Sequence, residues 1–433
     1  MAPRHYPDGG ARVGLCFGAV ARGIGRDDAP GAINIFTCTP NVLRWTWQRF
    51  RFWTTKRSQW VARHLNTREL GTLTLRRLDI LHSATWLQLG RFPAIPGCRR
   101  EELRHVLFCS NFAGEWDPYR QAFLDVVGSG VKSMWGSSLG FNRRFPRRGT
   151  RYDVEAWAWR RLPPTAHYYR AYPGLAPSTI RGAVRLTREL EQFAFNAAGP
   201  IGPGPDRLFI AFRQLQARMR DPHGAAPPGI VAGAVLGPRS ATAMSNFASV
   251  LPILPGREQA VLARIRSLPG GVASPFHLVE GTHFARLAVL DRRTASFHVR
   301  KPIVLRHSWL LFVADIDGHF PVDEARSRRM DGTEISRYMD AVDRSPVLRS
   351  MWQDCVGFRP DRPLAELIAP SVIDRFVLFL DHGDLTLREI DYALRVRHEY
   401  LRRLEKGLLG DRAGVEALLD HVRSAARSAQ RRP

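Results

Sequence analysis

At 433 residues the chain is long enough for two or three domains, and its 44% hydrophobic and 24% charged residues are ordinary for a globular protein. No run approaches the roughly 20 apolar residues needed to cross a bilayer. Five scattered cysteines without a C-x-x-C pair argue against a disulfide framework and a thiolate zinc site. The net charge of +24 predicts attraction to nucleic acid, anionic lipid or an acidic ligand. Only four of the 64 basic residues are lysine, however, and a GC-rich genome would impose that bias without any such partner.

Residues 1–73 are expected to form a flexible lead and an amphipathic helix. The first eight residues lack the apolar stretch of a signal peptide, which predicts a cytoplasmic protein. After a short strand at 34–38, a helix is predicted from Asn41 to Leu65, with its tryptophans on one stripe and arginines on the remaining surface. Such a helix is typical of a peripheral membrane interface. The alternative is that the stripe packs on the core of the domain.

Residues 74–198 are expected to form a first α+β unit in the order ββαββα. Strands are predicted at 82–89, 106–112, 131–135 and 166–172. Asp117 and Pro118 are typical of a helix start, with aspartate as the N-cap and proline in the first turn. Ser178 is predicted to cap the closing helix, which extends through Leu190.

Residues 276–410 are expected to repeat this order after a linker and insertion at 199–275. Strands are predicted at 283–290, 309–316 and 375–380, and apolar spacing predicts a helix between Ile335 and Val342. Thr386-x-x-Glu389 predicts a capping box at the start of a closing helix through Leu404. Residues 411–433 are expected to form a short basic helix and a frayed tail.

Three motifs occur in the same order in both units. His82-Ser83-Ala84 matches His283-Phe284-Ala285, LFCSNFAG at 107–114 matches LFVADIDG at 311–318, and Met134-Trp135 matches Met351-Trp352. The offsets are 201, 204 and 217 residues. This order and spacing predict an internal duplication. Because ββαββα is a cyclic permutation of the ferredoxin-like βαββαβ plait, we expect an α+β fold of two ferredoxin-like repeats packed sheet to sheet.

These motifs resemble those of uncharacterised bacterial α+β proteins that are distantly similar to Dyp-type peroxidases and to the dimeric α+β barrel group. Relatives of this type carry H-[FS]-A-R and S-N-[YF]-D-G. The second half keeps the first motif through Arg286 and the end of the second as Asp317-Gly318, whereas the first half has Thr85 and Ala113 at the matching places. The resemblance therefore implies that a site is built from the second half.

The resemblance also implies haem as a cofactor, because Dyp-type peroxidases hold it through a histidine in the C-terminal half. The candidate ligands are His283, His298, His307 and His319, and the candidate catalytic groups are Arg286 and Asp317. An imidazole ligates the iron, while a carboxylate and a guanidinium move a proton and stabilise charge during O–O cleavage. The family's G-x-x-D-G signature is incomplete, since Ala314 replaces its first glycine.

Several of these residues also have a structural interpretation. Equivalent placement of His82 and His283 favours a shared structural role, such as a hydrogen bond to a neighbouring strand. Asp315 and Asp317 are expected on one side of a strand, where they could form an acid–base pair, but a turn at Gly318 explains them as well.

Two functions follow from the sequence. The first is a haem-linked, peroxidase-like oxidoreductase that acts on a small oxidisable molecule. The second is a non-catalytic protein on the same scaffold that binds a hydrophobic ligand or, through residues 41–65, an anionic membrane. Nucleic-acid binding is disfavoured because no RNP-type aromatic pattern occurs. No Walker loop, G-x-S-x-G or H-E-x-x-H motif occurs either.

Overall fold

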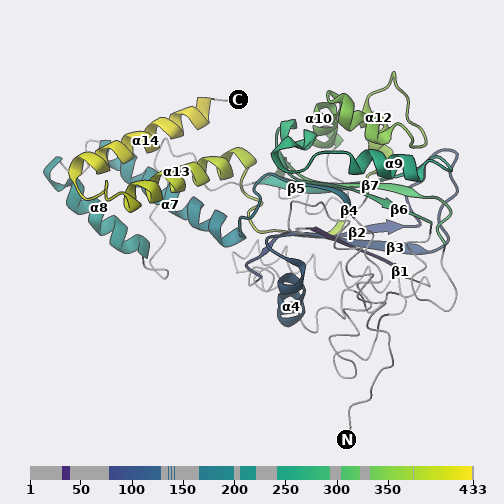
Figure 1. Cartoon of the computed structure of the whole chain (residues 1–433), viewed down its shortest axis with the longest axis horizontal. Coiled ribbons are helices and arrows are strands. Elements are labelled where there is room, and N and C mark those ends of the chain that lie inside the picture. Colours follow the sequence, from purple (N-terminus) through teal and green to yellow (C-terminus); the bar gives the residue numbers. More distant parts are fainter. Residues whose placement is uncertain are drawn as a thin grey trace, which may run out of the picture. The chain divides into compact units, whose positions relative to one another are not determined.

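The computed structural model describes residues 32–39, 78–127, 135, 138, 141, 165–198, 205–220, 241–292, 304–321, 332–373 and 375–431. The chain divides into two compact units (Figure 1). Unit 1 comprises Met1–Ala176 and Met244–Asp381, and unit 2 comprises Pro177–Ala243 and His382–Pro433. The helix expected from Asn41 to Leu65 lies outside the described residues.

Unit 1 contains two four-stranded antiparallel sheets, which confirms the predicted α+β class. The first sheet has the order β1-β3-β2-β8 and consists of β1 (Ala32–Thr39), β3 (Arg104–Phe112), β2 (Leu81–Gly90) and β8 (Arg375–Leu380). The second has the order β4-β6-β7-β5 and consists of β4 (Thr165–Arg170), β6 (Thr282–Leu290), β7 (Trp309–Pro321) and β5 (Ala241–Pro252).

Helices cover the outer face of each sheet in unit 1. Helix α4 (Trp116–Val127) lies on the first sheet, and α9 (Glu258–Arg266), α10 (Gly332–Asp343) and α12 (Leu364–Ile368) lie on the second (Figure 1). Successive side chains of β3 point to opposite faces of the first sheet. Phe108 packs in the core between this sheet and α4, whereas Cys109 packs in the core that includes residues of the second sheet. Both faces of the strand are buried, and apolar residues occupy successive positions from Val106 to Cys109.

The two central hairpins have the same register. Ala84 pairs with Ser110 in β2–β3, and Ala285 pairs with Ala314 in β6–β7. Both hairpins are interrupted at their histidine, between Leu81 and Ser83 in one and between Thr282 and Phe284 in the other. Each register shift reflects one extra residue, so each histidine occupies a β-bulge that re-aims its side chain.

The motifs after these hairpins also occupy matching surroundings. Trp135 packs edge-on against Phe108, with ring centroids 5.5 Å apart and planes at 84°. Trp352 packs in the same way against Phe312, at 5.4 Å and 86°. The backbone N–H of Ala171 donates to the carbonyl of His283, and that of Asp381 donates to the carbonyl of His82, both at 2.9 Å. Two separate kinds of contact in one half thus recur in the other.

The fourth strand of each half lies in the sheet of the other half. Strand β4 follows the first hairpin in sequence but pairs with β6, and β8 follows the second hairpin but pairs with β2. Each sheet therefore contains three strands from one half of the chain and one from the other.

Two sequence predictions differ from the structure in this region. Residues 199–275, expected to be a linker and an insertion, contain α8 (Pro205–Arg220), α9 and the 12-residue strand β5, and the strand was not predicted. The small residues of β5, ATAMSNFAS, have weak strand propensity, and pairing with the sheet overrides it. Of the strand predicted at 131–135, only Trp135 is described, and it is helical.

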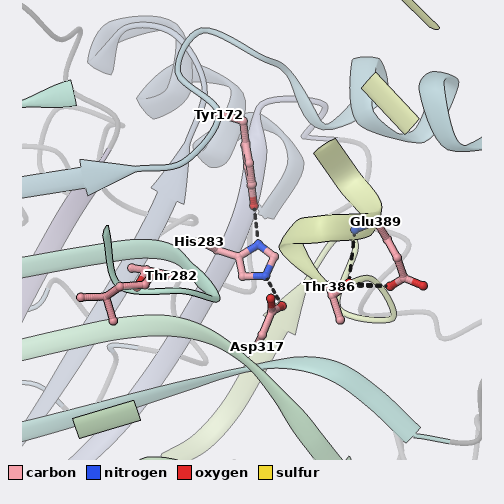
Figure 2. Close-up of polar contacts among 7 residues, drawn as sticks. Tyr172, Thr282, His283, Asp317, Thr386 and Glu389 are labelled. Carbon is pink, nitrogen blue, oxygen red and sulfur yellow. Dashed lines mark hydrogen bonds and ion pairs between the residues drawn. The ribbon is translucent and has the colours of Figure 1, made fainter. Parts of the chain in front are cut away.

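The described part of unit 2 consists of the helices α7 (Pro177–Ala198), α8, α13 (Leu387–Glu405) and α14 (Arg412–Arg431). The capping box is confirmed, because Thr386 Oγ1 accepts from the Glu389 N–H and Glu389 Oε2 accepts from the Thr386 N–H (Figure 2). The basic helix predicted within 411–433 is confirmed, but it is longer than expected and occupies most of the segment assigned to a frayed tail. Helix α14 has 20 residues, and it buries Val415, Leu418, Val422 and Ala426 in the helical core.

Candidate functional site

Arg286 of β6 is fully buried between the two sheets of unit 1. Its Nη1 donates to Oδ1 of Asn34 at 3.0 Å, and its Nη2 donates to the carbonyl of Ser110 at 3.0 Å and to Oδ1 of Asn111. The guanidinium also lies 5.8 Å from the ring centroid of Tyr168. A buried cation is tolerated only where such partners replace water.

Asp315 of β7 supplies the negative charge of the same network. Its Oδ2 accepts from Ser83 Oγ at 2.6 Å and from Asn111 Nδ2 at 2.7 Å, and its Oδ1 accepts from Asn246 Nδ2. Asn111 therefore links the carboxylate to the guanidinium of Arg286, since its oxygen accepts from one and its nitrogen donates to the other. This network joins the two sheets across their shared interior.

His283 lies at the end of β6 in a second polar cluster, drawn in Figure 2. Its Nε2 lies 2.7 Å from Oδ1 of Asp317, and its Nδ1 lies 3.2 Å from the hydroxyl of Tyr172. Burial, together with nearby carboxylates, raises the pKa of Tyr172 well above its ordinary value, so the phenol stays neutral. The imidazole is fully buried, whereas the Asp317 side chain is 24% exposed and links the cluster to solvent.

Local backbone geometry brings these side chains together. The bulge at His283 turns the imidazole out of the regular alternation of β6. Gly281 has φ +76° and accepts a 2.8 Å hydrogen bond from the Asp317 N–H. A Cβ at position 281 would lie 2.9 Å from Cβ of Asp317, so glycine permits this close approach.

The two catalytic candidates belong to separate clusters. Arg286 contacts the intersheet network, whereas Asp317 bonds to His283. Asp315 rather than Asp317 is the carboxylate of the Arg286 network, although Asp315 and Asp317 are only two residues apart. The acid–base pair that Asp315 and Asp317 could have formed is not observed among the described contacts.

The histidines expected to ligate haem are also dispersed. His307 precedes β7 beside Trp309, at the far end of the hairpin from His283, and eight strand residues separate the two ends by roughly 25 Å. Its Nε2 is buried and accepts or donates no described hydrogen bond. His298 and the side chain of His319 lie outside the described residues. A single haem site cannot combine His307 with Asp317.

His283 itself does not fit an iron ligand in this arrangement. A neutral imidazole directs Nε2–H to Asp317 and uses its only lone pair to accept from Tyr172, while a protonated imidazole has no lone pair. Iron needs a free imidazole nitrogen. Among the residues that the structure describes, no group of three or more His, Cys, Asp or Glu side chains is placed to hold a metal ion.

The sequence patterns did not single out Asn34 or Asn246, and they marked Ser83 only as part of a repeated motif. A signal was present at Asn111 and Asp315, because each is the polar residue at the fifth position of the matched motifs LFCSNFAG and LFVADIDG. No protein-family model matches the chain, and no curated protein matches its sequence.

Proposed function

We propose that this chain is a non-catalytic binding protein on a peroxidase-like α+β scaffold, and that it binds an anionic membrane surface. The observation that carries the first part is the bonding of His283, which uses both ring nitrogens within the protein. Arg286 likewise donates its hydrogen bonds to acceptors on β1 and β3. Groups that could ligate iron or stabilise charge on a substrate are thus used to hold strands together.

We infer that the scaffold arose by duplication of one unit whose copies exchange their fourth strands. Matching bulges at His82 and His283 support this, as do the matching Trp–Phe pairs. A duplicated scaffold allows one copy to lose polar groups that the other keeps. Thr85 in place of Arg286 is such a difference.

The anionic partner is supported by charge and by the sequence from Asn41 to Leu65. The chain carries a formal charge of +24, and each basic residue near an anionic membrane contributes about 1 kcal/mol of attraction. Tryptophans at helical spacing insert to headgroup depth. No helix in the described part of the chain is long and apolar enough to span a membrane. We propose a peripheral association, in which the tryptophans insert to headgroup depth.

Haemin titration tests the non-catalytic part of the proposal. We expect only shallow, non-saturating absorption changes when haemin is added to the purified protein, with the same result for His283→Ala and His307→Ala. A sharp Soret band that saturates at one equivalent, and that one of these variants abolishes, would overturn it. That outcome would restore the oxidoreductase interpretation with an identified iron ligand.

Vesicle co-sedimentation tests the partner. The full-length protein should sediment with phosphatidylcholine vesicles that contain phosphatidylglycerol, and much less with phosphatidylcholine alone. Binding should weaken as the salt concentration rises, because salt screens exposed charges. Equal binding to both vesicle types, or no binding to either, would contradict an anionic membrane partner.

A further inference from the structure

Two short helical turns and one short helix of unit 1 present the most exposed aliphatic side chains in its described part. Val272 in η1 (Gly271–Ala273) is 77% exposed, Leu278 in η2 (Pro275–Leu278) is 85% exposed, and Val347 in α11 (Pro346–Arg349) is 52% exposed. Single exposed aliphatic residues are normal on protein surfaces. Here η2 contacts both η1 and α11, so the three residues lie on adjoining elements.

The segment that carries Val272 and Leu278 is firmly anchored. Phe276, between them, is fully buried and stacks on Phe312 with centroids 5.8 Å apart. Ser274 is buried as well, and its Oγ accepts from the Phe276 N–H and lies 3.1 Å from Nε2 of His167. The two apolar side chains are therefore held outward by buried neighbours, and little ordering entropy is lost when they are covered.

Two exposed arginines lie on elements next to this region. Arg266 is exposed in the last turn of α9, and Arg344 is exposed three residues before Val347. Nη1 of Arg264 donates to the carbonyl of Ser350 at 3.0 Å, which fixes the end of α9 beside the residue that follows α11. One exposed carboxylate, that of Glu280, follows Leu278 by two residues.

We propose that Val272, Leu278 and Val347, flanked by Arg266 and Arg344, form a lipid-contact patch that binds an anionic headgroup layer. The aliphatic side chains enter the boundary between headgroups and acyl chains while the guanidiniums contact lipid phosphates. The inference rests on the proposed membrane function and adds the surface that performs it.

Area and charge favour lipid over a second protein as the occupant. A stable protein interface buries more than about 1,000 Å² with well-packed apolar anchors, whereas this region offers three short aliphatic side chains. Membrane binding instead adds the free energies of several weak contributions. One such contribution is the insertion of a few aliphatic side chains beside cationic residues. Residues 41–65 would supply another.

Co-sedimentation of the full-length protein with phosphatidylglycerol-containing vesicles tests the patch. The variant Val272→Ser/Leu278→Ser should lose binding by about tenfold or more, since each methylene removed from the boundary region costs about 0.8 kcal/mol. Arg266→Gln/Arg344→Gln should reduce the preference for phosphatidylglycerol over phosphatidylcholine. Ile210→Ser/Leu408→Ser, which removes two exposed aliphatic side chains from unit 2, should bind like the wild type.

The outcomes separate this inference from the proposed function. If the wild type binds and Val272→Ser/Leu278→Ser binds equally well, these side chains do not contact lipid. The lipid-contact patch is then refuted, and the proposed membrane function stands. If the wild type does not bind, both are overturned. A concentration-dependent dimer in analytical ultracentrifugation that this variant abolishes would assign the patch to self-association and overturn the lipid assignment. Circular dichroism and thermal unfolding confirm that each variant is folded.

Discussion

Asn111 and Asp315 occupy the same position in the two halves, and Nδ2 of Asn111 donates a 2.7 Å hydrogen bond to Oδ2 of Asp315. Equivalent residues of the two halves therefore meet between the two sheets. One is a neutral amide that both donates and accepts, and the other is a carboxylate that accepts only. This difference lets the pair connect to Arg286 on one side and to Ser83 on the other.

Removing the carboxylate should destabilise unit 1 strongly. Asp315→Ala leaves the donors of Ser83, Asn111 and Asn246 without their acceptor and leaves the charge of Arg286 uncompensated. We expect the free energy of unfolding to fall by about 3–5 kcal/mol. Urea denaturation followed by tryptophan fluorescence measures the change.

The exposed variant Asp361→Ala is the matched control, and it should change the free energy of unfolding by less than about 0.5 kcal/mol. The double variant Arg286→Met/Asp315→Leu should lose less stability than Asp315→Ala, because it removes both buried charges together. A double variant that loses as much as Asp315→Ala would show that shape, rather than charge, dominates at this position.

Gly281 and Gly182 should respond in opposite directions to alanine. Gly281→Ala is expected to cost roughly 2 kcal/mol or more, because φ +76° is unfavourable for alanine and the new Cβ would lie 2.9 Å from Cβ of Asp317. Gly182 lies inside α7 with open space around it, so Gly182→Ala should stabilise by about 0.5–1 kcal/mol. Equal effects of the two changes in thermal unfolding would contradict this account.

The capping box of α13 should contribute measurably to unit 2. Thr386→Ala removes the hydroxyl that accepts from the Glu389 N–H, which should cost about 1 kcal/mol. Ser424→Ala, at an exposed position inside α14, should be neutral or slightly stabilising, since alanine has the higher helix propensity. Differential scanning calorimetry of the two variants compares these effects directly.

Stability should decrease on acidification partly because of His105. Burial lowers the pKa of His105 from 6.5 to about 3 in the folded protein, where its ring stacks on Phe36 at 4.9 Å. Below pH 6.5 the unfolded chain therefore binds a proton that the folded chain does not, and stability is lost as the pH falls from 6.5 toward 3.

His105→Phe keeps an aromatic ring beside Phe36 but removes this titration. Between about pH 7 and about pH 4 the variant should lose less free energy of unfolding than the wild type. His167, whose pKa burial lowers to about 4, contributes in the same direction and should leave some pH dependence in the variant. An unchanged acid loss, measured by urea denaturation at each pH, would exclude His105 as a source.

Much of the secondary structure could be predicted from local signals. The strand at 375–380 agrees with β8, and the Thr386 capping box marks the start of α13. Strand β5 was missed because its alanines and serines lack the β-branched and aromatic residues that signal a strand. Helix α14 was underestimated because its basic residues suggested a frayed tail, although Leu418 and Val422 repeat at helical spacing.

The sequence by itself determined the α+β class, the order of most elements and the correspondence between the two halves, because periodicity, caps and repeated motifs are local properties of the chain. Only the tertiary structure decided which strands pair and which polar side chains meet. Asp315 and Asp317 look equivalent in sequence, yet Asp315 bonds across the sheets to Asn111 and Asp317 bonds within its own hairpin to His283. The exchange of β4 and β8 and the bulge at His283 set those partners, and both depend on backbone pairing between segments far apart in the sequence.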